Sequence, residues 1–439
     1  MEQTHSTVAG QAPQGALAAP PAQTERERLY VLRETCELLW PPPAVIKVDG
    51  SRSAGAPHAR AVRFRAAKPT RSEGREFVLI PGRRRPPMLV PTAPRVAAAA
   101  VRHYKRPSSL GARIGTKAIS LSLASGLGGS LFRRRVRVET PRGADTIETY
   151  LQDVVALELW VSMYLGPPRA NRKPVLELLT ATGQSAGFAK IGINHLTRDL
   201  IRGERATLLK LSRARLGEVT VPEVLHYGEW HDLDVLVLSA LPVWQRNQRI
   251  DTERLATAMD EVASVGGREQ HSLVTAPYLK QLRERLATAA ASAPRLALLN
   301  ALATLEERAG AEILTYGAWH GDWTPWNMAS TDNGLLVWDW ERFARGVPLG
   351  FDALHYWLQS EVSLKHRDPL RAATACPGHA DQLLVPFRVG ARQARLIAIL
   401  YLVELATRYL VDEQAKAGAR RGEPGTWLIP AIETGIAQL

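Results

Sequence analysis

The sequence predicts an α+β protein in which a small antiparallel sheet precedes a largely helical half. Short apolar segments separated by turn residues predict strands between residues 157 and 241, and one of these turns contains Gly183. From Pro242 onwards the apolar residues recur mostly at helical spacing, with an interruption at 320–341. With 439 residues, 45% of them hydrophobic, the chain is long enough for two or three domains.

The N-terminal region divides into a tail and an additional module. Residues 1–24 are rich in Ala, Gln, Pro, Thr and Gly and offer little to bury, so we expect a disordered tail. Residues 25–142 are predicted to form a basic N-terminal accessory module of α/β type. Its predicted elements are a helix at 28–40 that ends at three prolines, strands at 76–80 and 88–90 around a Pro-Gly-Arg turn, and an Ala-rich helix at 95–104.

A change of composition near residues 141–145 begins the next unit, which we predict to span 143–241 and to precede a helical unit at 242–439. Asp145 is the predicted N-cap of a helix that runs to about residue 154. The other predicted elements of the unit are strands at 157–165, 175–180, 187–191, 219–225 and 234–241, a loop at 166–172, and a helix that includes 200–211.

The formal net charge of +13 is concentrated in the N-terminal third. Residues 1–150 hold 25 basic and 11 acidic residues, and the remainder of the chain is close to neutral. A basic surface attracts anionic substrates, phospholipid surfaces or polyanions, but it is also typical of a solvated face in an Arg-rich protein. No aromatic-interleaved basic motif and no zinc-finger spacing occur, so we expect no nucleic-acid partner, while an anionic ligand or surface for the module stays open.

Cysteine usage and hydropathy predict a cytoplasmic protein. Cys36 and Cys376 have no metal-ligand spacing and do not indicate a disulfide framework. No signal-peptide pattern is visible at residues 1–24. The most apolar helix-like run, at 396–403, stops at Glu404 and is far shorter than the roughly 20 residues that a transmembrane helix requires.

The segment with the clearest chemistry begins at residue 320. It reads His320-Gly321-Asp322-Trp323-Thr324-Pro325-Trp326-Asn327 and is followed by Leu335-Leu336-Val337-Trp338-Asp339-Trp340-Glu341. Phosphoryl transfer requires a carboxylate that orients the acceptor and accepts its proton, and oxygen ligands for the Mg²⁺ that bridges the phosphates. Asp322 can meet the first requirement, and Asn327 and Asp339 can meet the second.

This arrangement resembles the aminoglycoside phosphotransferase family, the choline-kinase-like branch of the protein-kinase-like fold, which carries a His-Gly-Asp-x₄-Asn loop and a later Asp-Trp-Glu or similar motif. The resemblance covers about residues 145–439 and implies a bilobal fold, with a small antiparallel-sheet N-lobe and a helical C-lobe. It implies that Asp322 is the catalytic base, that His320 braces the loop, and that Asn327 and Asp339 bind the metal. Asp352, which ends Pro348-Leu349-Gly350-Phe351-Asp352, matches a structural Asp of the family at a slightly longer spacing.

The same fold requires a strand lysine that holds the α- and β-phosphates and a helix glutamate that holds the lysine. Lys190 and Glu204 occur in that order, on the third predicted strand and on the helix after it. No Gly-x-Gly-x-x-Gly motif is present, and the loop at 166–172 in its place is either a phosphate-binding loop or an ordinary turn. The predicted nucleotide contacts are Gly166, Arg169, Asn171 and Arg172 in this loop and Leu238, Ser239, Ala240 and Leu241 in the linker between the lobes.

The acceptor site is less defined by the sequence. Trp323 and Trp326 either stack on a sugar or aromatic acceptor or pack in the core. The helices at 246–311 and the C-terminal helices are expected to hold the acceptor. Their acidic residues Asp251, Glu253, Asp260 and Glu261 either bind a cationic acceptor or form a solvated face.

The sequence therefore predicts a phosphotransferase that depends on Mg²⁺ and on ATP or GTP. It would move the γ-phosphate to a hydroxyl of a small molecule, such as a sugar, an aminocyclitol or an amino alcohol. The sequence has His-Gly-Asp where protein kinases have His-Arg-Asp, Asp-Trp-Glu rather than Asp-Phe-Gly, and no Ala-Pro-Glu segment, which favours a small acceptor over a polypeptide. The alternative is a non-catalytic, kinase-like binding protein that engages an anionic partner through its basic module, and a third reading is nucleotidyl transfer.

Overall fold

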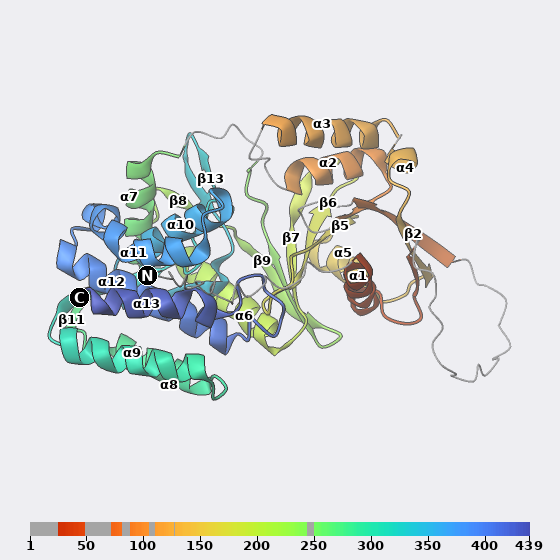
Figure 1. Cartoon of the computed structure of the whole chain (residues 1–439). Coiled ribbons are helices and arrows are strands. Elements are labelled where there is room, and N and C mark those ends of the chain that lie inside the picture. The colour runs from red at the N-terminus through yellow and green to blue at the C-terminus, as the bar shows by residue number, and fades with distance from the viewer. Residues whose placement is uncertain (1–24, 49–71, 81–87, 105–109, 127, 244–249) are drawn as a thin grey trace, which may run out of the picture.

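The computed structural model describes residues 25–48, 72–80, 88–104, 110–126, 128–243 and 250–439. The predicted tail at 1–24 and the predicted turn at 81–83 lie outside the described residues. The α+β class is confirmed, because one lobe is built on a large antiparallel sheet and the other is mainly helical (Figure 1).

The sheet lobe contains one nine-stranded sheet in the order β1-β4-β2-β3-β5-β6-β7-β10-β9. Strands on both sides of the predicted boundary at 142 and 143 belong to this sheet, because Met88 and Leu89 of β3 pair with Tyr164 and Met163 of β5. The division into an accessory module and an N-lobe stays a prediction. The strands are β1 (Val45–Val48), β2 (Ser72–Ile80), β3 (Met88–Pro91), β4 (Arg135–Pro141), β5 (Trp160–Leu165), β6 (Pro174–Leu179), β7 (Ser185–Gly192), β9 (Val224–Trp230) and β10 (Leu233–Leu238).

Helices cover both faces of this sheet, because successive side chains along a strand point to opposite sides. Phe77 and Leu79 of β2 belong to a core with α1 (Glu25–Leu39) and α5 (Ile147–Val155). Val78, between them, belongs to a second core with α2 (Pro94–Tyr104) and α3. Figure 1 shows α2 and α3 stacked above the sheet. The helices expected at 28–40 and 95–104 are present, whereas β4, α3 (Leu110–Ala124) and α4 (Gly128–Leu131) were not predicted.

Two predictions for residues 143–241 are wrong in detail. Thr146, and not Asp145, caps α5, and its hydroxyl accepts a hydrogen bond from the Thr149 N–H at 3.2 Å. Asp145 instead accepts a hydrogen bond from the indole N–H of Trp230 at 2.9 Å. The strand expected at 219–225 is interrupted at Pro222, which has no N–H to donate. A short β8 (Val219–Thr220) therefore pairs in parallel with β14, in a different sheet, and β9 begins at Val224.

The helical lobe packs around α12 (Ala391–Val411), in which every residue from Leu396 to Thr407 is buried. Glu404 lies within this run and accepts hydrogen bonds from the guanidinium of Arg285, which compensates the buried charge. No helix among the described residues is long and apolar enough to cross a membrane. The other elements are α6 (His195–Leu211), α7 (Thr252–Ala263), β11 (Glu269–Ser272), α8 (Pro277–Thr288), α9 (Ala293–Ala309), β12 (Ile313–Trp319), β13 (Met328–Thr331), β14 (Gly334–Val337), β15 (Ala344–Pro348), α10 (Phe351–Gln359), α11 (Pro369–Leu383) and α13 (Leu428–Ala437).

Substitution of Leu89 can show whether the strands β1–β4 and the strands from β5 onwards unfold together. The Leu89 side chain is 1% exposed, and its strand joins these two groups of strands. Leu89→Ala should lower the free energy of unfolding by about 2–5 kcal/mol in a single transition, measured by urea denaturation. Leu157→Ala, at a leucine that is 48% exposed, is the control and should cost less than about 0.5 kcal/mol. Two transitions of which only one shifts would contradict a cooperative sheet.

Candidate active site

Lys190 lies at the centre of the candidate site. Its strand, β7, is paired on both sides, so Lys190 lies opposite Val175 of β6 and Leu236 of β10. The Lys190 Nζ donates to both carboxylate oxygens of Glu204, at 2.6 and 2.7 Å, and to the Asp339 Oδ1 at 2.7 Å. The structure therefore brings together three residues from separate elements that the sequence assigned to one site.

Burial and charge act in opposite directions on this cluster. Burial alone would lower the pKa of Lys190, but the carboxylates of Asp339 and Glu204 hold it above its usual range. Burial alone would raise the pKa of Asp339, but the neighbouring Lys190 and Lys173 hold it below its usual range. Lys190 is therefore a cation and Asp339 an anion at neutral pH.

The backbone at Asp339 is also unusual. It follows β14 and has φ 73° and ψ 52°, the left-handed region that side chains other than Asn and Asp rarely adopt. The next residue, Trp340, is fully buried, and its N–H donates to the Glu204 Oε1 at 3.2 Å. The contact between Trp340 and Glu204 therefore fixes the turn that directs Asp339 towards Lys190.

His320 organises the loop that carries Asp322. The His320 Nδ1 accepts a hydrogen bond from the Asp322 N–H at 3.1 Å, and its Nε2–H donates to the Trp338 carbonyl at 3.1 Å. Both contacts require the neutral ring, and burial lowers the pKa of His320 to about 4. This arrangement supports the predicted bracing role of His320.

Gly321 and Asp352 complete the bracing of the loop. Gly321 has φ +83°, and a Cβ at this position would lie 2.2 Å from the Arg342 carbonyl oxygen, so only glycine fits. The carboxylate of Asp352 accepts hydrogen bonds from the His320 N–H at 2.7 Å and the Gly321 N–H at 3.2 Å. Burial raises the pKa of Asp352 to about 7, although these two backbone bonds oppose the shift. Asp352 therefore contacts the backbone of the loop, and its structural role stays a prediction.

Asp322 is held by contacts to each of its oxygens. The Asn327 Nδ2 donates to the Oδ2 at 2.9 Å, and the His355 ring nitrogen Nε2 lies 3.1 Å from the Oδ1. The hydroxyl of Tyr401 lies 2.9 Å from the other ring nitrogen of His355, so the neutral ring with its proton on Nε2 satisfies both neighbours. Burial alone would raise the pKa of Asp322, but the hydrogen bond from His355 holds it below its usual value. His355 has no distinguishing sequence pattern, because a single histidine in an apolar helix is usually a core residue.

The loop at 166–172 is closed against the helical lobe. Asn171 donates to the Glu341 Oε1 at 2.9 Å, and Lys173 donates to the Oε2 of the same carboxylate. The Ala170 N–H donates to the Gln414 side chain at 3.2 Å. These contacts place Asn171 beside Glu341, two residues after Asp339, and its phosphate contact stays a prediction. The role of Lys173 was missed, because it follows a loop that has no glycine motif. Glu341 ends the Asp-Trp-Glu motif, but only Asp339 of that motif was assigned to the metal.

Of the other predicted nucleotide-binding residues in this loop, Arg169 and Gly166 lie near the site and Arg172 lies near α1. Arg169 lies close enough to Asp339 to lower its pKa, and it lies beside Gly166, whose added Cβ would be 3.8 Å from the guanidinium. Arg172 lies near Glu34 of α1, and burial lowers its pKa. We find no contact between Arg172 and Asp339 among the described residues.

The predicted linker follows β10 and runs between the two lobes. Leu238 is the last residue of β10, and the Ser239 hydroxyl accepts a hydrogen bond from the Glu223 N–H at 2.8 Å. Leu241 packs on Ala329 of β13 and Leu336 of β14, and Asp339 follows shortly after β14. The segment 238–241, which includes Ala240, therefore adjoins the β13–β14 hairpin, and its contact with a nucleotide base stays a prediction.

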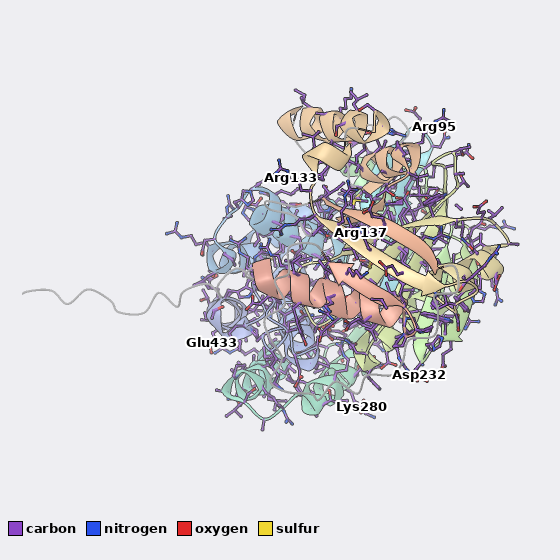
Figure 2. All side chains as sticks on the ribbon, turned by 90° about the vertical axis from the view of Figure 1, so that its right-hand side faces the viewer. Arg95, Arg133, Arg137, Asp232, Lys280 and Glu433 are labelled. Carbon is purple, nitrogen blue, oxygen red and sulfur yellow. The ribbon has the colours of Figure 1, made fainter. Side chains whose placement is uncertain are left out.

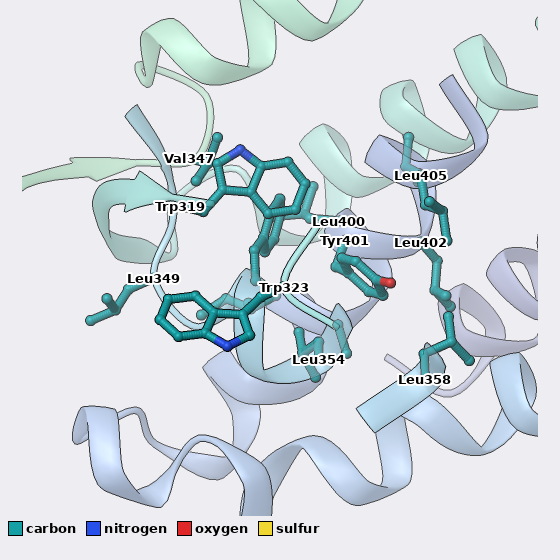
Figure 3. Close-up of a cluster of buried hydrophobic side chains, with 14 of the residues drawn as sticks. Trp319, Trp323, Val347, Leu349, Leu354, Leu358, Leu400, Tyr401, Leu402 and Leu405 are labelled. Carbon is teal, nitrogen blue, oxygen red and sulfur yellow. The ribbon is translucent and has the colours of Figure 1, made fainter. Parts of the chain in front are cut away.

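The tryptophans and acidic residues considered for acceptor binding are largely structural. Trp323 is fully buried, and Figure 3 shows it among apolar side chains of the helical lobe that include Trp319, Leu354 and Tyr401. Trp326 is half-buried. Glu261 accepts hydrogen bonds from the Glu218 and Val219 N–H groups at 3.0 Å, and Asp260 pairs with Arg268. Asp251 caps α7, whose next acidic residue is Glu253.

The donor set fits a divalent cation. Carboxylate oxygens of Glu204, Asp339 and Glu341 lie within 4.8 Å of one another. The Asn327 amide nitrogen is used by Asp322, which leaves its amide oxygen as a ligand, and the Asn327 carbonyl accepts from the Trp338 N–H at 3.1 Å. Carboxylate and amide oxygens are the ligands that Mg²⁺ prefers. The carboxylate group thus adds Glu204 and Glu341 to the predicted ligand Asp339, and Asn327 stays a predicted ligand.

No family model and no curated protein matches the chain. Its structure is similar to that of a thermostable mutant of aminoglycoside phosphotransferase APH(4)-Ia in a ternary complex with ADP and hygromycin B. The sequence identity is 13%, the TM-score is 0.44, and the match covers 66% of this chain and 98% of that chain. It is also similar to the choline kinase LicA from Streptococcus pneumoniae, with 13% identity, coverage of 67% and 99%, and a TM-score of 0.43. A third similar structure is a fructosamine-3-kinase candidate from Thermobifida fusca, with 17% identity, coverage of 67% and 100%, and a TM-score of 0.39. All three are named as small-molecule kinases.

The pKa of His320 predicts how stability depends on pH. The folded pKa of about 4 lies below the ordinary value of 6.5, so the unfolded chain takes up the proton first as the pH falls. The stability that neutral His320 contributes is present above pH 6.5 and is lost by about pH 4. The difference in unfolding free energy between the wild type and His320→Gln should therefore shrink by about 3 kcal/mol over this window in urea titrations. A difference that stays constant with pH would contradict the buried neutral ring.

Proposed function

We propose that the protein is a phosphotransferase that moves the γ-phosphate of ATP or GTP to a hydroxyl of a small molecule. The observation that supports this proposal is the convergence of Lys190, Glu204 and Asp339 within ion-pair distance, on elements that also position the loop of Asp322. A scaffold protein has no need for this combination of a strand lysine, a helix glutamate and two carboxylates on separate loops.

Asp322 has the environment of a general base. Its side chain is 31% exposed, so an acceptor hydroxyl can reach it, and its lowered pKa keeps it ionised at neutral pH. The acceptor oxygen would form a bond to the γ-phosphorus while the bond from this phosphorus to the β–γ bridging oxygen breaks. Asp322 would receive the hydroxyl proton, and the nucleoside diphosphate would leave.

The remaining predicted residues would bind the nucleotide and its metal. Lys190 would hold oxygens of the α- and β-phosphates while Glu204 keeps the ammonium group in place. Asp339 and Asn327, with Glu341, would hold Mg²⁺, which when bound neutralises charge on the phosphates. Asn171 and Arg169 would contact the phosphates, and the segment 238–241 would contact the base.

The acceptor is proposed to be a small hydroxyl compound, such as a sugar, an aminocyclitol or an amino alcohol. We also propose a cytoplasmic location, since Cys36 and Cys376 are both free and buried, as expected in a reducing compartment. One observation favours the alternative of a non-catalytic binding protein. Asn171 and Lys173 both bind Glu341, so the loop lies directly on the proposed metal site. Nucleotide would have to loosen these contacts.

The first test is the release of ADP or GDP in the presence of Mg²⁺ across a panel of sugars, aminocyclitols and amino alcohols. One acceptor should stimulate release, and Asp322→Ala should lower the rate by about 10²–10⁴-fold, since a general base contributes this much. Asp153→Ala, at an exposed carboxylate on α5, is the matched control and should retain full activity. Absence of both turnover and nucleotide binding would favour the binding protein, and release of pyrophosphate would indicate nucleotidyl transfer.

His355 is predicted to position Asp322 and to keep its pKa low. His355→Ala should lower kcat by about 10–100-fold with little change in the KM for the nucleotide. The acidic limb of the pH–rate profile should move to higher pH, because the carboxylate loses the hydrogen bond that favours its ionised form. His355→Gln, which keeps a donor, should recover part of the rate. An equal loss in both variants, with the limb unmoved, would show that His355 has only a packing role.

A further inference from the structure

The charge of one continuous region is not explained by phosphoryl transfer. Residues 77–138 contain thirteen Lys and Arg residues and no Asp or Glu. This stretch includes α2, α3 and α4, which lie on the face of the sheet away from α1 and α5. Arg135 and Arg137 pair with Glu76, and the remaining cations of this region produce a positive field that attracts an anionic surface.

One face of α3 is apolar and exposed. Ile114 is 61% exposed and Leu121 is 70% exposed, and seven residues, or two turns, separate them, so they lie on the same side of the helix. The other side of α3 packs on α2, where the Ser120 hydroxyl donates to the Ala98 carbonyl and Leu123 is buried. Leu131, at the end of α4, is 64% exposed. Three large apolar side chains are therefore directed away from the protein.

Exposed basic side chains lie on α3 and on the elements next to it. Lys117 lies between Ile114 and Leu121 on α3 and is exposed, as are Arg95 on α2 and Arg133 just after α4. None of the three cations has an acidic partner among the residues that the structure describes. Figure 1 shows α3 as the outermost layer at this end of the molecule, and Figure 2 shows Arg95 and Arg133 on the same end.

We propose that the outward face of α3 and α4 binds the surface of membranes that contain anionic lipids. Apolar side chains at the centre of a basic surface match the layered chemistry of a bilayer, in which the acyl region lies beneath charged headgroups. A nucleic acid would satisfy the cations but would leave Ile114, Leu121 and Leu131 against hydrated phosphates. With 15 residues, α3 is too short to span a bilayer and would lie in the plane of the interface.

The contributions of charge and apolar burial can be separated by mutation. Removing a basic side chain near an anionic surface costs about fivefold in binding per charge, and preventing the insertion of a large apolar side chain costs about tenfold or more. Leu121→Glu should therefore weaken binding by at least about tenfold, and Lys117→Gln by about fivefold. Both side chains are exposed, so the fold should be retained, as circular dichroism and thermal melting would verify.

The experiment is co-sedimentation of the full chain with vesicles of phosphatidylcholine alone or with phosphatidylserine, at low and physiological salt. Leu296→Glu is the matched control, because this leucine is 60% exposed on α9 of the helical lobe. Binding that requires phosphatidylserine, weakens with salt, and is lost in Leu121→Glu but not in Leu296→Glu would support the proposal. Sedimentation independent of phosphatidylserine, or unchanged in Leu121→Glu, would overturn it. A polynucleotide that binds the wild type and Leu121→Glu equally and blocks vesicle binding would assign the surface to nucleic acid instead.

Discussion

The ion cluster of Lys190, Glu204 and Asp339 is the interaction on which the arrangement of the candidate site depends. Burying a charged side chain destabilises the fold unless an opposite charge lies beside it, and removal of one member of a buried pair leaves the other charge uncompensated. The cluster is therefore stable only when β7, α6 and the turn at Asp339 are in place together. The Lys190 Nζ lies within 2.7 Å of Glu204 and of Asp339, which belong to two other elements. The cluster therefore fixes the position of the sheet relative to the segment that contains Asp339.

The short segment that follows β14, residues 338–342, connects the ion cluster to the rest of the site. The segment is in a left-handed turn at its second residue, so neighbouring backbone and side-chain groups point in different directions. Each of its five residues makes a contact with a different part of the molecule, which explains why loops far apart in the sequence share one geometry. These contacts are Trp338 with His320, Asp339 with Lys190, Trp340 with Glu204, Glu341 with Lys173, and Arg342 with Asp412.

Sequence reasoning found the parts of the site whose chemistry is unusual for their surroundings. A carboxylate at the end of an apolar strand, such as Asp339, or a lysine within one, such as Lys190, contradicts its local pattern and is therefore visible. His355 agrees with its pattern, since it lies in an apolar helix, and only the fold shows that Asp322 lies beside it. The cap of α5 was misassigned for a similar reason, because Asp145 and Thr146 are adjacent and both are good caps. In the structure the Asp145 carboxylate is bound by the indole of Trp230, which is more than eighty residues distant, and Thr146 remains to cap the helix.

The pairing of β3 with β5 has a consequence for how the molecule is organised. Without β3, the strand β5 would be an edge with unpaired backbone groups, which is a site of aggregation in many proteins. The strands from the N-terminal region cover this edge and continue the sheet to β1, so the region is part of the lobe that carries Lys190. The basic helices are then attached to that lobe through the core that includes Val78 and Leu179, on the face opposite α1. A surface contact of these helices would thus act on the same lobe that carries Lys190, through a core separate from the ion cluster.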